Sequence, residues 1–354
     1  MCDPQLTLDS QATDYPPSAA AMNPQVSVVI PTYNRAEKVR KSIESVLEQS
    51  FTDFEVVVVD DGSSDDTEQI LRSAFGDRIR YFFQSNQGAS VARNRGIAES
   101  RGTWVAFLDS DDVWEKDKLE SQLHALDQFA PQCGGCYTDV RFFNHSETRT
   151  MFEAAVTSYH HEGAAGINDE ALRLLVRPGG AGMVICLSSF MGRRDLMQQI
   201  GGFNPKILYS QDSDFMFRLA LLTRLCYVNR PLVGFDRAPV ESRHVGVSAD
   251  WNKVDFFLQD SQIRLESLQR LVAGQPAAVR SLIRRQLAQV HSGWVNYYLQ
   301  TGQYGKARTA ASRAVMTSAS VNVAAKWLLT WFSPGLALRQ IRQRESKRAA
   351  EFTV

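Results

Sequence analysis

The sequence lacks an excess of either charge, a long apolar run and an obvious targeting segment. Its 354 residues contain 39 Lys and Arg and 39 Asp and Glu, so the formal net charge of zero gives no support to broad electrostatic binding of nucleic acid. No run of about 18 apolar residues occurs, as a membrane-spanning helix would need. Residues 1–24 have no apolar core of signal-peptide length. We therefore expect a cytoplasmic protein without a nucleic-acid partner.

Cysteine is also scarce, with five residues in a long chain. An odd number without a secretory pattern favours reduced thiols over a disulfide framework. Cys133 and Cys136 form a CxxC pair, which zinc sites use together with a second ligand pair. His160 and His161 lie nearby but match no zinc pattern. Two ordinary thiols are the preferred interpretation, and a zinc site is the alternative.

Strands and helices are predicted to alternate in the first third of the chain. Residues 1–24 are polar and contain Pro, Ser and Ala, which is typical of a disordered leader. Short apolar runs then predict buried strands at residues 26–30, 54–60, 79–84 and 103–109. Amphipathic segments predict helices at residues 36–49, 67–75 and 88–100. This alternation indicates an α/β fold with a parallel sheet covered on both faces.

Distinctive polar residues follow three of these strands. They are Pro31-Thr32-Tyr33-Asn34, Asp60-Asp61-Gly62 and Asp109-Ser110-Asp111. Ligands of parallel sheets bind beyond the carboxyl ends of the strands, so we expect the three segments to face one crevice. An acid in the second segment could contact a nucleobase or a ribose hydroxyl; the alternative is a turn that only begins a helix.

Asp109 and Asp111 form a D-x-D pattern directly after an apolar run. In extended backbone, residues i and i+2 point the same way, so the two carboxylates would repel unless a cation lay between them. Mg²⁺ and Mn²⁺ favour oxygen ligands and often combine few protein carboxylates with substrate phosphates. The alternative is a solvated acidic turn. Arg93 and Arg95 could neutralise such a phosphate, or could lie on a solvated helix face.

Two quoted segments carry a resemblance to a known family. "VSVVIPTYNRAEKVRKSIESVLEQSFTDFEVVVVDDGSSDDT" and "NQGASVARNRGIAESRGTWVAFLDSDDVW" resemble the nucleotide-sugar-binding half of family 2 glycosyltransferases, over about residues 25–120. The resemblance implies a GT-A fold, a nucleotide-diphospho-sugar donor, a divalent metal (Mn²⁺ or Mg²⁺) and inversion at the anomeric carbon. A UDP-sugar is the family's default donor. A glycan or lipid-linked molecule is the expected acceptor.

The resemblance also assigns roles to individual residues. Donor binding is implied for Pro31, Thr32, Tyr33, Asp61, Arg93, Asp109 and Ser110. Metal binding is implied for Asp111 as the direct ligand and for Asp109 in a supporting role. "SRHVGVS" loosely resembles a family region with a His, so His244 is the candidate for a further metal ligand, with a solvated loop His as the alternative.

An inverting transfer also needs a base for the acceptor hydroxyl. Asp212 and Asp214 begin a strongly apolar predicted helix, where the helix dipole alone would favour acids. The family has an "E-D" pair at this point, and Gln211-Asp212 occupies it here. Asp212 therefore matches the catalytic base and Asp214 is the second candidate. Gln211 departs from the family pattern, which leaves the role of the preceding acid in doubt.

The chain from residue 251 onward is predicted to be helical. We expect a GT-A domain over residues 25–250, with its acceptor half at 121–250, and a helical extension over 251–354. The segment 293–316 resembles one tetratricopeptide-type hairpin, and a single such unit cannot form a solenoid. The apolar and basic residues of 324–348 suit peripheral contact with a membrane, or packing against the body of the protein.

The sequence therefore predicts an inverting glycosyltransferase of glycan or glycolipid assembly. A nucleotidyltransferase is one alternative, although "PTYNRAEKV" lacks the glycines of a phosphate loop. A non-catalytic protein that binds sugar nucleotides is the other, because Gln211 replaces an acid.

Overall fold

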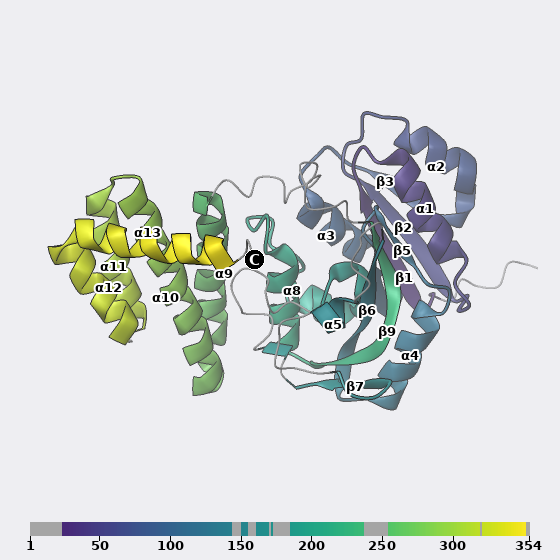
Figure 1. Cartoon of the computed structure of the whole chain (residues 1–354). Helices are drawn as coiled ribbons and strands as arrows, with labels where there is room; N and C mark the ends of the chain where they lie inside the picture. Colours follow the sequence, from purple (N-terminus) through teal and green to yellow (C-terminus); the bar gives the residue numbers. More distant parts are fainter. Residues whose placement is uncertain are drawn as a thin grey trace, which may run out of the picture.

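The computed structural model describes residues 23–143, 150–154, 161–169, 171–172, 185–236, 254–318 and 321–351. The predicted leader therefore lies almost wholly outside the described residues, as does His244. Figure 1 shows a twisted sheet with helices on both faces, and a group of helices beside it that ends in α13.

Nine strands of the described residues form one sheet, in the order β3-β2-β1-β4-β8-β6-β9-β5, with β7 paired to β9. They are β1 (Val26–Thr32), β2 (Phe54–Asp60), β3 (Arg80–Phe83), β4 (Trp104–Phe107), β5 (Asp112–Trp114), β6 (Cys133–Phe143), β7 (Ala165–Asn168), β8 (Phe190–Arg193) and β9 (Arg224–Asp236). The parallel arrangement predicted for β1 to β4 is confirmed. Beyond β4 the sheet is mixed, because β8 runs antiparallel to both β4 and β6.

The helices fall into two layers and an extension. They are α1 (Ala36–Leu47), α2 (Thr67–Phe75), α3 (Ala89–Glu99), α4 (Lys118–Gln128), α5 (Met151–Ala154), α7 (Arg194–Gln199), α8 (Gln211–Ala220), α9 (Val254–Leu271), α10 (Ala277–Gln300), α11 (Tyr304–Thr317), α12 (Val321–Phe332) and α13 (Pro334–Glu351). Among them, none combines the length and the apolar character that crossing a bilayer requires.

Alternation along β1 divides the core into two halves. Val28 and Ile30 belong to a cluster with side chains of α1, α2 and α4. Val29 belongs to a second cluster, on the face covered by α3 and α8. Successive strand residues point to opposite faces, so an unbroken apolar run is what a sheet covered on both sides requires.

The sheet register brings the predicted strand ends to one edge. Thr32 is opposite Asp60 in the β1–β2 pair, and Val29 is opposite Phe107 in the β1–β4 pair. The residues that follow β1, β2 and β4 therefore emerge together. The turn after β2 depends on Gly62, whose φ is +88° and where an added Cβ would lie 2.7 Å from the backbone nitrogen of Asn86.

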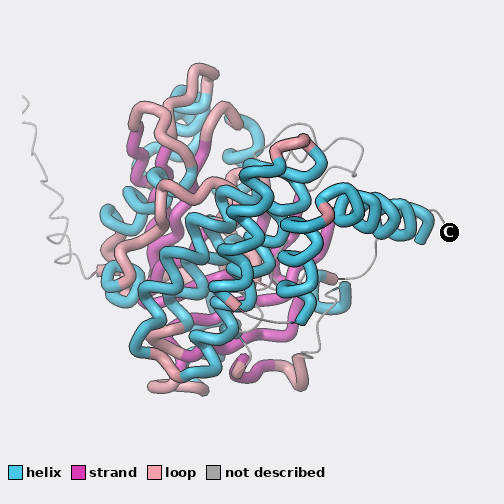
Figure 2. The backbone as a smooth tube through the Cα atoms, turned by 90° about the vertical axis from the view of Figure 1, so that its left-hand side faces the viewer, coloured by secondary structure: helices cyan, strands magenta, loops and turns pink. Residues whose placement is uncertain are grey.

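The extension is joined to the sheet domain through a common core. Leu265 and Leu268 of α9 and Leu287 of α10 belong to the same buried cluster as Phe215 of α8. Viewed from the side of the extension, its helices lie in front of the strands (Figure 2). The predicted hairpin at 293–316 corresponds to the end of α10 and most of α11, with Gly302 at φ +73° in the turn between them.

The CxxC cysteines are buried free thiols on β6, and Cys226 of β9 is a third. The hydrogen bond with Cys226 and burial raise the pKa of Cys133 above its ordinary value. His161 lies elsewhere, stacked on Phe152 with its ring nitrogen 2.9 Å from the Tyr137 hydroxyl. Within the described ranges, no group of three or more His, Cys, Asp and Glu residues could hold a metal ion. The choice between ordinary thiols and a zinc site stays a prediction, because His160 lies outside the described residues.

Candidate active site

The loops after β1 and β2 are tied together by Asn34. Its backbone N–H donates to Ser63 Oγ at 2.8 Å, and its side-chain oxygen accepts from the Ser64 N–H at 2.8 Å. Tyr33 precedes it and is 48% exposed, whereas Pro31 and Thr32 are buried. Thr32 Oγ1 has no hydrogen-bond partner among the described residues. An exposed ring beside an unsatisfied hydroxyl is a surface on which a planar base could bind.

Asp61 holds the segment that leads into α3. One carboxylate oxygen accepts hydrogen bonds from Gln84 Nε2 at 2.8 Å and the Gln87 N–H at 3.0 Å, and the other accepts from the Gly88 N–H at 2.7 Å. Asp60 is fully buried and accepts from the Ser63 N–H and the Tyr81 hydroxyl. Asp61 thus lies at the shared edge, where it already orders the loop before α3.

Arg93 is the centre of the site. Its buried guanidinium donates to Asp109 Oδ1 at 2.7 Å and lies 3.5 Å from Asp212 Oδ1. Burial lowers the pKa of Arg93, but Asp109 and Asp212 raise it above its ordinary value, so the guanidinium stays charged. The end of β4 and the start of α8, about 100 residues apart in the chain, are joined through one side chain.

Burial raises the pKa of Asp212, Arg93 opposes this rise, and Asp109 adds to it. The Asp212 side chain keeps 26% of its surface exposed, so a substrate hydroxyl could reach it. A carboxylate with a raised pKa is a stronger base than an ordinary one, while Arg93 holds it in one orientation. Arg95, by contrast, turns away and donates to the Phe83 carbonyl at 2.6 Å.

Gln211 belongs to the same network. Its side-chain oxygen accepts from Ser90 Oγ at 2.7 Å and from Arg93 Nη1 at 3.1 Å. A third carboxylate at this position would compete with Asp109 and Asp212 for one guanidinium. The neutral amide accepts the same hydrogen bonds without adding charge, which gives the departure at Gln211 a physical reason.

Asp214 has a different setting from Asp212. Its side chain is 1% exposed, and one oxygen accepts a hydrogen bond from Arg218 Nε at 2.8 Å and lies 2.7 Å from Arg218 Nη2. A buried carboxylate paired in this way stabilises the start of α8, and it is not accessible to a substrate. Asp212 is therefore a partly exposed carboxylate, whereas Asp214 belongs to a buried ion pair.

Asp109 and Asp111 do not lie in extended backbone, so the expected parallel alignment of their side chains is wrong. Residues 109–112 form a turn in which the Asp112 N–H donates to the Asp109 carbonyl at 3.0 Å. Asp109 faces Arg93, and Asp111 pairs with Arg35 at 2.7 Å. The turn is held by Ser188, whose hydroxyl accepts from the Asp109 N–H at 3.0 Å and donates to buried Asp112.

The donor set at this turn fits a divalent cation. The Asp109 and Asp111 side chains are 32% and 28% exposed and present carboxylate oxygens, which Mg²⁺ and Mn²⁺ prefer. Burial and the charge of Asp109 raise the pKa of Asp111, although Arg35 opposes the rise. Such mutual repulsion is what a bound cation would relieve. Ser110 between them is buried.

Asp260 of α9 fixes the approach to α8. One of its oxygens accepts from the backbone N–H groups of Leu208 and Tyr209 at 2.6 and 3.2 Å. The other accepts from the N–H and the hydroxyl of Ser210. The residues directly before Asp212 are therefore positioned by the extension, so the extension takes part in building the site.

We predict that Asp260→Asn destabilises the fold by about 1–3 kcal/mol, because an amide leaves some of these donors unsatisfied. Chemical denaturation measures the change. Asp255→Asn is the matched control, since Asp255 lies on the same helix and its carboxylate, among the described residues, accepts from the Tyr297 hydroxyl at 3.3 Å and from the Phe256 N–H at 3.0 Å. Equal stability of the two variants would contradict the role given to Asp260.

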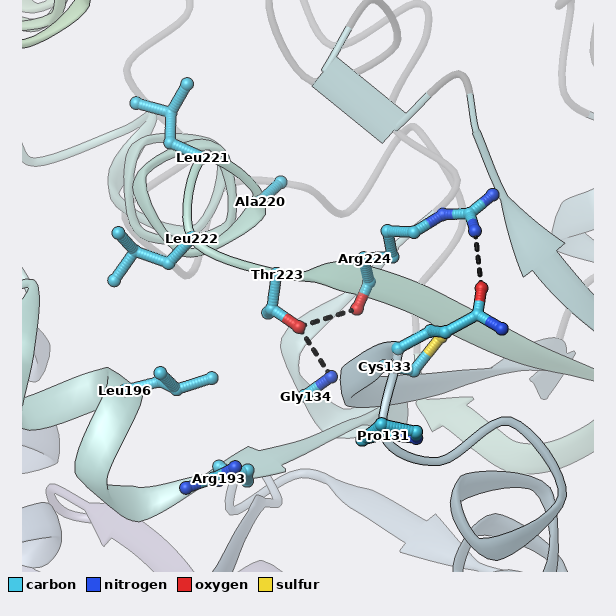
Figure 3. A pocket seen from close by; sticks show the side chains of 11 residues that line it. Pro131, Cys133, Gly134, Arg193, Leu196, Ala220, Leu221, Leu222, Thr223 and Arg224 are labelled. Atoms are coloured by element: carbon cyan, nitrogen blue, oxygen red, sulfur yellow. Dashed lines mark hydrogen bonds between the residues drawn. The ribbon is translucent and has the colours of Figure 1, made fainter.

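A separate pocket of about 460 Å³ lies at the opposite end of α8 from Asp212. Figure 3 shows Thr223 donating to the Arg224 carbonyl and accepting from the Gly134 N–H. Arg224 pairs with Asp169, and Arg193 with Asp195. Both cations already have carboxylate partners, and the pocket does not adjoin the strand ends that carry the predicted site.

Sequence reasoning missed four residues that build the site: Arg35, Ser90, Ser188 and Asp260. Arg35 had a local signal, because it directly follows the Tyr33-Asn34 pair at a strand end. The contacts of the other three bridge segments 50 or more residues apart, so no local pattern indicated them.

Comparison with known proteins identifies the family and the fold. The family model "Glycosyl transferase family 2" matches residues 27–201. The chain is 47% identical over 105 residues to an uncharacterised glycosyltransferase of Rickettsia felis, a match that covers 29% of this chain and 17% of the relative. It is 46% identical over 106 residues to the putative teichuronic acid biosynthesis glycosyltransferase TuaG of Bacillus subtilis, covering 29% of this chain and 42% of TuaG. These matches span less than half of either relative.

Among solved structures, residues 1–349 of S. aureus TarS in complex with UDP-GlcNAc superpose with a TM-score of 0.63 at 16% identity, covering 91% of this chain and 92% of that one. Residues 27–201 thus belong to glycosyltransferase family 2, and the chain has the GT-A fold with a helical C-terminal region. The family and the fold implied by the sequence motifs are confirmed.

Proposed function

We propose that the protein is an inverting glycosyltransferase that moves a sugar from a nucleotide-diphospho-sugar to an acceptor hydroxyl. The observation that carries the proposal is the bridge formed by Arg93 between Asp109 and Asp212. The bridge supports a role for Asp109 beside the donor and for Asp212 as the base of the acceptor, because one hydrogen-bond network holds both. Family membership of residues 27–201 supports the class of reaction.

In this proposal Asp212 takes the proton from the acceptor hydroxyl as the oxygen attacks the anomeric carbon. Its position at the first turn of α8 keeps the carboxylate partly exposed toward the crevice. Arg93 orients the carboxylate through its second guanidinium contact and opposes the rise of its pKa that burial causes. The attacking oxygen gains electron density as the proton leaves, so attack and proton removal assist each other.

Asp111, with Asp109, would hold the divalent cation. A bound Mg²⁺ or Mn²⁺ stabilises the negative charge that develops on the leaving nucleoside diphosphate. Arg35 now pairs with Asp111, and the Arg35 side chain is 36% exposed, so it could turn toward a phosphate when the carboxylate acquires another partner. Pro31, Thr32 and Tyr33 would lie against the nucleobase, Asp61 would contact the base, and Ser110 would lie beside the donor.

A UDP-sugar is the proposed donor, and a glycan or a lipid-linked glycan the proposed acceptor. The fold-level neighbour TarS was solved with UDP-GlcNAc, and the relative TuaG is named for teichuronic acid biosynthesis. Incubation with a panel of UDP-sugars and Mn²⁺ tests the reaction class. Release of UDP supports it, whereas release of pyrophosphate would favour a nucleotidyltransferase, and no release with any donor would favour a binding protein.

We also propose peripheral contact with a membrane that carries the acceptor. Leu328, Trp331 and Phe332 lie on one face of α12 and are 40% to 77% exposed, and Leu336 of α13 is exposed beside them. Arg308 lies over the Trp331 ring at 5.4 Å, and Arg339 is exposed on α13. Apolar side chains bordered by cations suit an anionic bilayer surface.

We predict that Phe332→Ser weakens binding to vesicles of anionic lipid about tenfold, because burial of a phenyl ring contributes about 1.5–3 kcal/mol. Sedimentation with the vesicles measures the bound fraction. Met316→Ser is the control, since Met316 is 87% exposed at the other end of α11 from Arg308. If both variants bind as the wild type does, the patch does not contact the bilayer.

A further inference from the structure

A pocket of about 520 Å³ lies between α9, α10 and α11, within the helical extension. His291, Trp294 and Tyr298 line it from one face of α10, at the i, i+3 and i+7 positions. Lys306 and Arg313 line it from α11, also seven residues apart. Two helical turns of each helix therefore face the same space, over roughly 10 Å.

The aromatic residues of the pocket are ordered by contacts with each other and with Lys306, whose Nζ lies 5.7 Å from the centre of the Tyr298 ring. The Trp294 and Tyr298 rings stack with centroids 5.2 Å apart and planes 18° apart. Trp294 Nε1 donates to Gln262 Oε1 at 2.9 Å, and Gln262 Nε2 donates to Glu266 Oε1 at 2.7 Å. The indole is fixed before any ligand arrives, which lowers the entropy cost of binding. Fixed rings with a few polar groups are typical of a small-ligand site.

The polar groups of the pocket favour an anion. None of the described residues that line it is acidic, and Lys306 and Arg313 are exposed cations. His291 is more than nine-tenths buried and forms no hydrogen bond within the described part of the chain. Burial and the charge of Arg313 lower the pKa of His291, and Glu266 only partly opposes this shift, so at neutral pH the ring offers one donor and one acceptor.

We propose that this pocket binds a segment of an anionic glycan, with sugar rings against Trp294 and Tyr298 and acidic groups paired with Lys306 and Arg313. The proposal rests on the proposed function, because the glycan would be a remote part of the acceptor. Gln262, which lines the pocket, and Asp260, which holds the approach to Asp212, are two residues apart on α9 and face opposite sides of it. The pocket would therefore bind sugar units of the acceptor that are remote from its reacting hydroxyl.

Calorimetric titration of the full chain with hexagalacturonate, and with neutral maltohexaose, tests the proposal. We expect the wild type to bind hexagalacturonate, more weakly as salt is added, and to bind maltohexaose at least about tenfold more weakly. The double variant Lys306→Glu, Arg313→Glu should lose at least about tenfold in affinity for hexagalacturonate. Arg284→Glu, Arg285→Glu is the matched control, because both arginines are exposed on α10 outside the pocket.

Release of UDP from a UDP-sugar, measured on the same samples, separates this proposal from the proposed function. Loss of glycan binding with unchanged UDP release in the double variant supports the pocket. Glycan binding that is equal in the double variant and the control overturns it, whether or not UDP is released. Tighter binding of hexaglutamate than of hexagalacturonate would also overturn it, because the site would then prefer an acidic peptide.

Discussion

Asp212→Asn is expected to lower the turnover number for sugar transfer about 10²- to 10⁴-fold, which is the usual contribution of a positioned general base. An amide cannot accept the hydroxyl proton, but it can still accept a hydrogen bond from Arg93, which lies 3.5 Å from the carboxylate. Arg93 also keeps its closer contact with Asp109. The donor side should therefore remain in place, and the affinity for the UDP-sugar should change little.

The pH dependence of the wild type should report the same group. The pKa of Asp212 is raised by burial, so the base becomes protonated at a higher pH than an ordinary carboxyl as the solution is acidified. Activity is thus present above this raised pKa and lost as pH falls through it. Asp195→Asn, an exposed acid of α7 outside the network, serves as control. If Asp212→Asn retains most of its activity, Asp212 is not the catalytic base.

Asp111→Asn should lower the turnover number by a similar factor. It should act on the metal that binds the donor diphosphate, and not on deprotonation of the acceptor. The variant keeps the turn, which is held by the Asp112 N–H and by Ser188. It loses one of the two carboxylate charges that favour a divalent cation there. We expect at least about a hundredfold loss of turnover at fixed Mn²⁺, partly restored as the Mn²⁺ concentration is raised.

Asp117→Asn is the matched control for that experiment. Asp117 lies six residues further along, pairs with Arg230 on the exposed surface, and loses the same charge on substitution. Steady-state rates over a range of Mn²⁺ concentrations separate a weakened metal site from a damaged fold. If Asp111→Asn and Asp117→Asn behave alike at every Mn²⁺ concentration, Asp111 is not a metal ligand.

The sequence predicted the first half of the fold well because the patterns there are local. The strand at residues 54–60 and the helix at 67–75 have the predicted bounds, since apolar runs and helical periodicity act over a few residues. β6 and β9 had no such clear pattern. β6 contains a Gly-Gly pair, β9 contains Pro231, and their pairing has register shifts at Asp139, all of which disrupt simple alternation.

Only part of the site could be predicted from the sequence, for a related reason. Residue types at a strand end identified Asp109 and Asp111, and a predicted helix supplied Arg93, but their partners depend on tertiary contacts. Sequence could not show that Arg93 joins Asp109 to Asp212, because the two acids are about 100 residues apart. It also left Asp212 and Asp214 as alternatives. The buried ion pair of Asp214 with Arg218 distinguishes them, and this is a property of packing.

The central claim is that the carboxylates after β4 hold a cation that binds the diphosphate of the donor. The most direct measurement is calorimetric titration of UDP into the wild type and into Asp111→Asn, each with Mn²⁺ and with EDTA. The account predicts that Mn²⁺ strengthens UDP binding to the wild type at least about tenfold and has little effect on the variant. Equal UDP affinity under all four conditions would contradict it.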